Sequence, residues 1–239
     1  MPGAQFFAAA FAFAAAACSV VHASPAHLKR QLAPVRTLGT IACTGWAGHD
    51  KDHSGIRVWT IRDGVLQEDT SINGGLGNND GSKIAPNSGF FRPKNGEYTI
   101  ANNAAISAAS AYNWENRTVE VQMFFVSTDN ILRSYYFDGT TWGEGTIKVV
   151  MPQFAQRLSA NAFRINGVTT WSVIYAEGNG ETTTLKEFRS VGPNAWRWAG
   201  NIGTTPRDTA FAALVSVSGN TVNEVVIAAN NVKYRTNWQ

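Results

Sequence analysis

Residues 54–70 read Ser-Gly-Ile-Arg-Val-Trp-Thr-Ile-Arg-Asp-Gly-Val-Leu-Gln-Glu-Asp-Thr. Two β-prone runs flank the dipeptide Asp63-Gly64 in the middle of this stretch. Both central residues of a type I′ turn need positive φ, and Asp-Gly is one of the sequences that meets this need. The stretch therefore predicts a tight β-hairpin in which Thr60 pairs with Gln67.

The same register places charged and aromatic residues on one face of the hairpin. It pairs Trp59 with Glu68 and Arg57 with Thr70, and because side chains alternate along a strand, all four share a face. Arg57 lies diagonal to Glu68, within reach of long side chains. Such a face can bind a sugar, since the charged groups hydrogen-bond hydroxyls and the indole stacks on the C–H face. It also fits an exposed ion pair beside a half-buried Trp, which stabilises little.

The N-terminus has the pattern of a secretory leader. An apolar run rich in Ala and Phe ends in a small-residue cleavage signature, so we expect residues 1–23 to be a signal peptide. The dibasic pair Lys29-Arg30 predicts a short pro-segment at residues 24–30 and a single mature domain at residues 31–239. We therefore expect a secreted, extracellular protein. The apolar run is short for a membrane span, and no later stretch is long enough for one.

Composition excludes several functional classes. Without residues 1–30 the chain has 18 basic and 17 acidic residues, which is no footprint for nucleic-acid binding. Cys43 is the one cysteine outside the leader, so no disulfide is expected in the mature chain. The run from His49 to His53 lacks a third soft ligand, and we expect neither a metal nor a cofactor. Asn116-Arg-Thr118 is a glycosylation sequon on an expected loop.

The rest of the chain is a repeat of short strands separated by turns rich in Gly, Asn, Asp and Ser. Four units share the layout of a small-residue strand, an apolar strand, a turn and a third strand. Their spacing is about 50 residues, with a longer insert between the first and second units. The expected strands are 40–46, 55–59 and 65–68; 105–112, 118–125, 130–139 and 141–145; 158–163, 170–175, 184–188 and 196–200; 211–216, 223–228 and 231–235.

Repeats of this length with about four short strands are typical of β-propeller blades. The sequence thus predicts an all-β, propeller-like fold of four blades. Residues 74–103 form either a long loop or a degenerate fifth blade, with Tyr98-Thr-Ile100 as one strand. The fourth unit lacks an obvious last strand, which residues 35–38 could supply to close the ring.

Several motifs of these units resemble the fungal fucose-specific lectins. The matching segments are Ser54-Gly-Ile-Arg-Val-Trp59, Leu66-Gln-Glu68, Asp129-Asn-Ile-Leu132 and Asp138-Gly-Thr-Thr-Trp142-Gly-Glu-Gly145, and the diffuse resemblance covers most of residues 40–235. It implies a propeller, six-bladed in that family, and a non-catalytic role in binding fucosylated glycans.

The resemblance also implies a site between adjacent blades. Arg57 and Glu68 match the family's polar pair, while Tyr135 and Trp142 match the aromatic residues of the next blade. Trp59 stands where the family usually has Tyr. Because the other units depart from the pattern, at most one such site is intact; the departing residues are Gln122, Ser134, Ser172, Glu224, Val225 and Arg235, whereas Glu187 is kept.

Other readings stay open. A chain too short for six blades forms either a smaller propeller or a ring completed by a homo-oligomer. The lost Arg and Glu positions fit a secreted interaction protein on a lectin scaffold without sugar binding. A glycoside hydrolase would need two flanking carboxylates, and the candidates Asp50, Asp52, Glu68 and Glu115 have no motif context. We therefore expect a protein that is not an enzyme.

Overall fold

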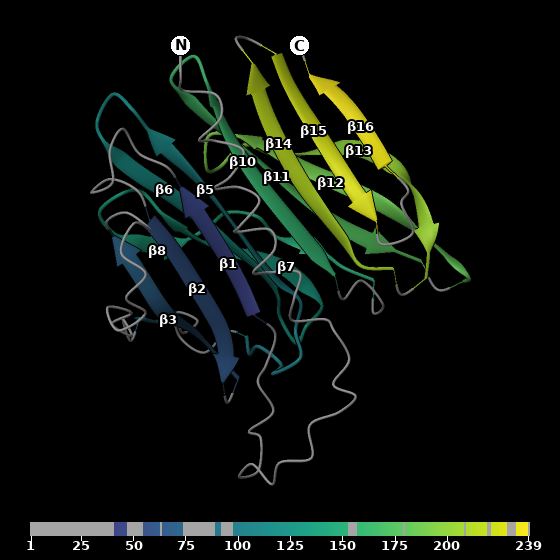
Figure 1. Cartoon of the computed structure of the whole chain (residues 1–239). Coiled ribbons are helices and arrows are strands. Elements are labelled where there is room, and N and C mark those ends of the chain that lie inside the picture. Colours follow the sequence, from purple (N-terminus) through teal and green to yellow (C-terminus); the bar gives the residue numbers. More distant parts are fainter. Residues whose placement is uncertain are drawn as a thin grey trace, which may run out of the picture.

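The computed structural model describes residues 41–46, 55–62, 64–73, 89–91, 98–152, 157–178, 180–207, 209–218, 221–228 and 233–238. These residues form four antiparallel sheets, which we number in chain order (Figure 1). The all-β prediction is confirmed, and the four units of the repeat correspond to the four sheets.

Within each sheet the strands pair in the order in which they follow in the chain. The first sheet consists of β1 (Ile41–Trp46), β2 (Gly55–Arg62), β3 (Val65–Asn73) and β4 (Gly89–Phe91). The second consists of β5 (Ile106–Asn113), β6 (Thr118–Val126), β7 (Ile131–Phe137) and β8 (Trp142–Glu144), with β9 (Val149–Val150) also pairing with β7. The third consists of β10 (Leu158–Ile165), β11 (Val168–Glu177), β12 (Thr182–Val191) and β13 (Trp196–Pro206). The fourth consists of β14 (Phe211–Ser218), β15 (Thr221–Ala228) and β16 (Lys233–Trp238).

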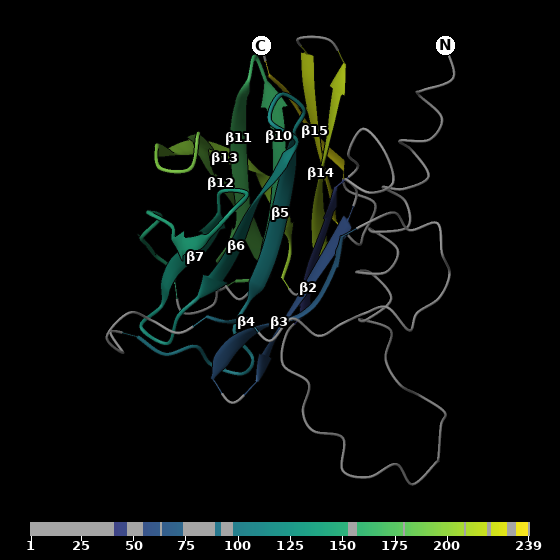
Figure 2. The ribbon, with the colours of Figure 1, turned by 90° about the vertical axis from the view of Figure 1, so that its left-hand side faces the viewer.

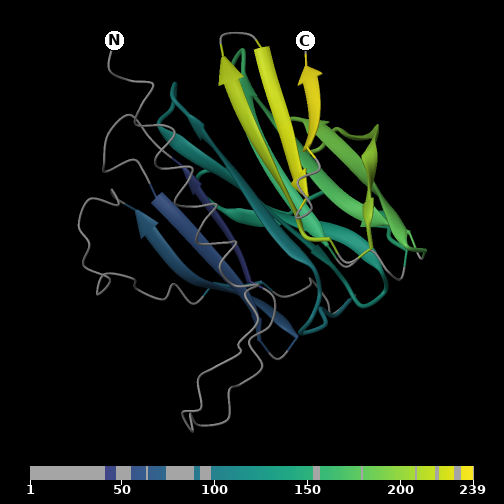
Figure 3. The same cartoon turned by 45° about the vertical axis from the view of Figure 1, so that its right-hand side comes forward.

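The sheets succeed one another like the blades of a propeller. Their first strands are neighbours, because β5 contacts β1 and β10, and β10 in turn contacts β14. The sheets follow one another from the purple to the yellow end of the chain, and Figures 2 and 3 show this succession from two further sides. The described sheets form an open arc in which the first and fourth do not pair. This arrangement confirms the propeller-like prediction.

Serine side chains link the first strands across the sheets. The backbone N–H of Ala160 donates to Ser107 Oγ at 2.9 Å, and the N–H of Ala213 donates to Ser159 Oγ at 2.7 Å. The two bonds join corresponding positions of successive repeats. Small side chains let the strands approach closely enough for such bonds, which explains why the first strands of the repeats are rich in small residues.

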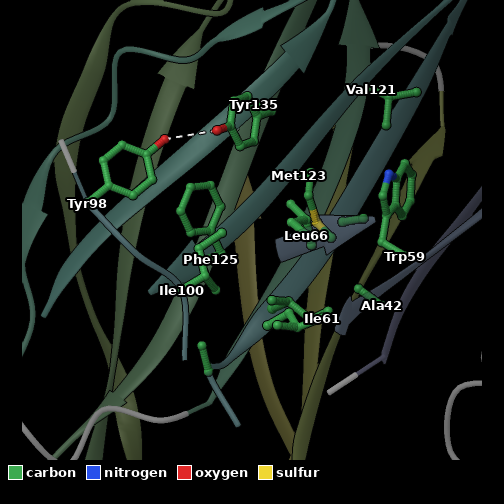
Figure 4. Packing of buried hydrophobic residues seen from close by; sticks show 13 residues of the cluster. Ala42, Trp59, Ile61, Leu66, Tyr98, Ile100, Val121, Met123, Phe125 and Tyr135 are labelled. Atoms are coloured by element: carbon green, nitrogen blue, oxygen red, sulfur yellow. Dashed lines mark hydrogen bonds between the residues drawn. The ribbon is translucent and has the colours of Figure 1, made fainter. Parts of the chain in front are cut away.

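Apolar side chains fill the space between adjacent sheets. Between the first and second sheets, Trp59, Ile61 and Leu66 meet Met123 and Phe125, all at most 1% exposed (Figure 4). A second cluster lies between the second and third sheets, and a third between the third and fourth. A single antiparallel sheet cannot bury both of its faces, so this stacking stabilises the repeat.

The hairpin of residues 54–70 forms with one change in register. Gly64 has the expected positive φ of 72°, while Asp63 lies outside the described residues. Thr60 pairs with Gln67 and Trp59 with Glu68, as predicted. A β-bulge between Val58 and Trp59 then shifts the pairing, so that Arg57 faces Ser71 rather than Thr70. An extra residue in one strand displaces every later pair, and a hydrophobic pattern alone does not show where it occurs.

Residues 89–91 and 98–100 correct the prediction for the insert. Gly89–Phe91 is the fourth strand of the first sheet, so this part of the insert belongs to that blade. Tyr98-Thr-Ile100, the strand that the fifth-blade alternative would contain, is not a strand in the structure. It packs against the second sheet instead. Thr128 N–H, in the turn between β6 and β7, donates to the Thr99 carbonyl at 2.9 Å, and Tyr98 and Ile100 are buried. The expected closing strand at residues 35–38 lies outside the described residues.

Three further expectations concern the disulfide, the run from His49 to His53 and membrane-spanning segments. Cys43 is disulfide-bonded in the full chain, whereas the expectation of no disulfide was made for the chain without its leader and stays a prediction. The other half of that bond and the run from His49 to His53 lie outside the described residues. In the part of the chain that is described, no helix is long and apolar enough to cross a membrane.

Candidate functional site

Arg57 and Glu68 form an ion pair on the face of the first sheet that packs against the second. Arg57 Nε lies 3.5 Å from Glu68 Oε1, and the two side chains are 9% and 6% exposed. The predicted pairing is therefore confirmed, although the pair is buried rather than exposed. The ordinary view of a surface ion pair does not apply, because both charges have lost most of their contact with water.

Aromatic rings from both sheets surround the guanidinium. Arg57 Cζ lies 4.3 Å from the centroid of the Phe137 ring, 5.5 Å from that of Trp142 and 5.9 Å from that of Trp46. All three rings are half-buried. A cation within about 6 Å of an aromatic centroid is attracted by the quadrupole of the ring. The first sheet thus supplies the two charges and Trp46, and the second sheet supplies Phe137 and Trp142.

Burial works against both charges of the pair. It raises the pKa of Glu68 and lowers the pKa of Arg57, and the attraction between the partners opposes each shift only in part. Among the described residues, neither Arg57 Nε nor Glu68 Oε1 has a hydrogen-bond partner, since their separation of 3.5 Å is longer than an ordinary N–H···O hydrogen bond. Each charged group therefore has one buried polar atom without a hydrogen bond.

A tight turn holds Phe137 and Trp142 together. The two residues pair at the end of the hairpin between β7 and β8. Asp138 Oδ1 accepts hydrogen bonds from the N–H groups of Thr140 and Thr141, both at 2.8 Å. These backbone bonds, with help from the Thr140 hydroxyl, lower the pKa of Asp138 to about 2. The turn fixes the aromatic wall of the site, and Trp142 also packs edge-on against Trp59, with ring centroids 6.2 Å apart.

Two of the predicted site residues, Trp59 and Tyr135, lie in the core. Trp59 is 0% exposed, pairs with Glu68 across the hairpin and packs edge-on against Trp142. Tyr135 is 4% exposed, stacks on Phe125 at 5.4 Å and shares a hydrogen bond of 3.0 Å with the hydroxyl of Tyr98 (Figure 4). Trp142 alone of the three predicted aromatic residues is half-buried and lies over Arg57.

The positions equivalent to Arg57 and Glu68 differ in the next two sheets. In the second sheet Gln122 Nε2 donates to Ser134 Oγ at 2.9 Å, so a neutral pair replaces the ion pair. A Cβ on Gly145 would lie 2.0 Å from Ser134 Oγ, so the Ser134 side chain lies close against the backbone of residue 145.

The third sheet keeps the carboxylate and takes its arginine from another position. Ser172 Oγ donates to Glu187 Oε1 at 2.8 Å, and Arg189, two residues along β12, also pairs with Glu187. Arg189 was not predicted, because the motif that Arg57 matches places the arginine on the second strand of each unit. The side chains at the equivalent positions of the fourth sheet lie outside the described residues.

Sequence reasoning also missed Phe137 and Trp46. Phe137 stands two residues after Tyr135 on the same strand, so the alternation of side chains would have placed both on the face toward the first sheet. Trp46 ends β1, and its proximity to Arg57 follows from the pairing of β1 with β2, in which Thr44 is opposite Arg57. Neither residue belongs to a motif with a known spacing.

The remaining candidates lie elsewhere. Asn116 is exposed on the turn between β5 and β6. Glu115, a hydrolase candidate, is on the same turn with a side chain 77% exposed, and lies 4.0 Å from Arg164. Asp50 and Asp52 lie outside the described residues. Among those residues no group of His, Cys, Asp and Glu is arranged to hold a metal ion.

Comparison with known proteins gives structural matches only. No protein-family model and no curated protein sequence matches the chain. Solved structures do match: the lectin of Aleuria aurantia in complex with alpha-methyl-L-fucoside is 17% identical with a TM-score of 0.60, over 84% of this chain and 60% of that chain. SapL1 lectin in complex with alpha methyl fucoside is 19% identical with a TM-score of 0.54, over 84% of this chain and 59% of that one.

These matches establish the fold. The Aleuria aurantia lectin is described as a six-bladed β-propeller. The present chain spans 60% of the length of that lectin. It therefore has the β-propeller-like fold of the fungal fucose-specific lectins over the part of the ring that it spans.

Proposed function

We propose that this chain is a secreted, non-catalytic carbohydrate-binding protein with one site of the fucose-lectin type, centred on Arg57 and Glu68. The observation that carries the proposal is the buried ion pair between two sheets, enclosed by aromatic rings from both. The motif resemblance and the shared fold support it, since the solved lectins that the chain resembles are described in complexes with fucosides.

The chemistry of the site suits a deoxy sugar. The Arg57 guanidinium donates hydrogen bonds and the Glu68 carboxylate accepts them, so together they match hydroxyl groups, which do both. Charge-assisted hydrogen bonds are the stronger kind. The rings of Trp142 and Trp46 offer apolar surface to the C–H face and methyl group of fucose. Because Phe137 lies nearest to the guanidinium, the sugar approaches along the edges of the two more distant rings.

The energetics of the pair also favour a binding role. Burial shifts the pKa of each group in the direction that disfavours its charge. A buried ion pair of this kind contributes little net stability compared with apolar residues of similar size. Perturbed ionisable groups at an interface are candidates for a functional site on this ground. A hydroxylated ligand would supply hydrogen bonds that the protein itself does not provide.

A single site for one monosaccharide binds weakly. Useful avidity then requires several sites on one assembly, and a homo-oligomer would supply them. Glycans on a cell surface or on secreted glycoproteins are the natural multivalent partners. Entry of the chain into the secretory pathway through residues 1–23 and cleavage after Lys29-Arg30 are part of the same proposal.

A second candidate function is protein binding on a scaffold that has lost sugar recognition. The observation that favours it is the covering of Arg57 by Phe137 at 4.3 Å, which leaves the guanidinium little room for a ligand. The replacement of the ion pair by Gln122 and Ser134 in the second sheet points the same way.

Saturation-transfer NMR with L-fucose, D-galactose and D-mannose distinguishes the two functions. The proposal expects saturation of the fucose methyl and ring protons in the parent chain and its loss in an Arg57→Met/Glu68→Leu variant. The matched control is Gln122→Leu/Ser134→Ala, which removes the equivalent polar pair one sheet away and should retain the signal. Absence of transfer to all three sugars from the folded parent protein would favour the protein-binding function.

A further inference from the structure

The turn between β5 and β6 exposes a large aromatic ring. Trp114 is 52% exposed, and its ring packs edge-on against Tyr112 with centroids 5.1 Å apart and an interplanar angle of 83°. Tyr112 is buried, so this contact holds one edge of the indole against the sheet. An indole fixed in this way keeps part of its apolar surface exposed to water at a defined place on the turn.

The glycosylation sequon lies on the same turn. Asn116 is exposed, two residues after Trp114, and its Oδ1 accepts hydrogen bonds from the Thr118 hydroxyl at 2.6 Å and from the Thr118 N–H at 3.3 Å. Arg117, between them, has a positive φ of 57°, which brings Thr118 back toward Asn116. The amide oxygen thus faces the hydroxyl of the sequon, and Nδ2 donates no hydrogen bond to the described residues.

We propose that Asn116 carries an N-linked glycan and that its first sugar stacks on the indole of Trp114. In the transfer step Nδ2 forms a bond to C1 of the sugar and loses one proton to a base. The bond between C1 and the diphosphate oxygen of a lipid-linked oligosaccharide breaks, and no redox change occurs. The inference requires passage through the secretory pathway and does not depend on sugar binding at Arg57.

The stacking follows from the geometry of the turn. Residues 114 and 116 belong to one four-residue connection, closed by the pairing of Asn113 with Thr118. An N-acetylhexosamine has a face of axial C–H groups that packs on an indole. Covering the exposed half of Trp114 in this way removes apolar surface from water and stabilises the hairpin. Trp114 then contacts the glycan with its exposed face and Tyr112 with its buried edge.

The test uses the full chain produced in yeast behind a cleavable secretion leader, so that entry into the pathway does not depend on residues 1–23. Mass spectrometry measures occupancy of Asn116. Melting temperatures are compared for the glycosylated protein, for protein trimmed to a single sugar, and for an Asn116→Gln variant. The same three forms are made with Trp114→Ala. Asn116→Gln loses the hydrogen bond to Thr118 whether residue 114 is Trp or Ala, so the difference between the two series isolates the contribution of the indole.

We expect full or partial occupancy and a melting temperature about 2–4 °C above that of Asn116→Gln, the shift for about 1 kcal/mol in a domain of this size. The single-sugar form should keep this increment, and Trp114→Ala should abolish it. Trp198, 47% exposed and in no sequon, is the matched control, and Trp198→Ala should leave the increment unchanged. An unmodified Asn116 in the folded, secreted protein, or the same increment with Ala at position 114, would overturn the proposal.

Discussion

The guanidinium of Arg57 lies 4.3 Å from the ring centroid of Phe137, across the interface between the first and second sheets. Residue 57 comes from the second strand of one repeat and residue 137 from the third strand of the next. The candidate site therefore exists only when two repeats are stacked. A single hairpin can place the two charges side by side, but it cannot enclose them.

The first prediction concerns the contribution of the ion pair to stability. Arg57→Met leaves the Glu68 carboxylate buried without its partner, so the free energy of unfolding should fall by about 3 kcal/mol. Arg57→Met/Glu68→Leu replaces both charges by apolar groups and should lie within about 1 kcal/mol of the parent. Urea unfolding measures all three proteins. A double variant as unstable as the single one would show that the pair is structural.

The second prediction concerns pH. Burial raises the folded-state pKa of Glu68 above its ordinary value of 4.5, so the folded state holds this proton more tightly than the unfolded state. The resulting stabilisation is present below pH 4.5 and is lost as the pH rises through the folded pKa. Urea unfolding at several pH values measures the free energy of unfolding of the parent and of Glu68→Gln. As the pH rises from 4.5 through the folded-state pKa, the parent should lose stability relative to the variant.

The same protonation should control sugar binding in the opposite direction. A hydroxyl donates to the carboxylate but not to the protonated oxygen, so affinity for fucose should fall on acidification. The midpoint should lie above the ordinary pKa of 4.5. Affinity that is constant down to pH 4 would contradict a role for Glu68 as the acceptor.

The third prediction concerns the turn that positions Trp142. Gly139 has a φ of 101°, and a Cβ there would lie 2.8 Å from Thr118 Cβ. Gly139→Ala should therefore reduce the free energy of unfolding by about 1–3 kcal/mol and weaken fucose binding. Gly143→Ala is the matched control, because nothing lies within 4 Å of its added Cβ. Equal stability of the two variants would show that the turn tolerates the added methyl group.

The fourth prediction separates Tyr135 from the site. Tyr135→Phe removes the hydrogen bond to Tyr98 and should cost about 1 kcal/mol of stability without changing sugar affinity. A double-mutant cycle with Tyr98→Phe should assign this cost to the pair. A loss of affinity in Tyr135→Phe at unchanged stability would instead return this residue to the binding site.

The sequence predicted most of the fold because the repeat carries the same signals four times. Each unit pairs small residues with an apolar strand and a turn, and the hairpin around Gly64 fixed the pairing of Trp59 with Glu68. The bulge at Val58 escaped prediction, because the placement of an extra residue depends on packing against the next sheet. The fifth-blade alternative placed Tyr98 on a strand because aromatic and β-branched residues are common in strands, whereas its burial comes from packing against Phe125 and Tyr135 of the second sheet.

The charged residues of the candidate site could be predicted from the sequence, but two of the three aromatic residues around the Arg57 guanidinium could not. Arg57, Glu68 and Trp142 came from motifs with fixed spacing, and the structure brings them together. Phe137 and Trp46 belong to no motif, and their contact with Arg57 arises from the stacking of two sheets. Arg189 shows the converse case, in which an arginine at a new position pairs with the carboxylate that the motif retains.

Calorimetric titration of the mature protein with L-fucose, beside the Arg57→Ala/Glu68→Ala variant, tests the central claim most directly. The account predicts weak, saturable binding to the parent, with one site per chain, and no binding to the variant. The variant should first be shown to fold by its melting transition. Binding that survives in the folded variant would contradict the assignment of the site, and would direct attention to Glu187 and Arg189 in the third sheet.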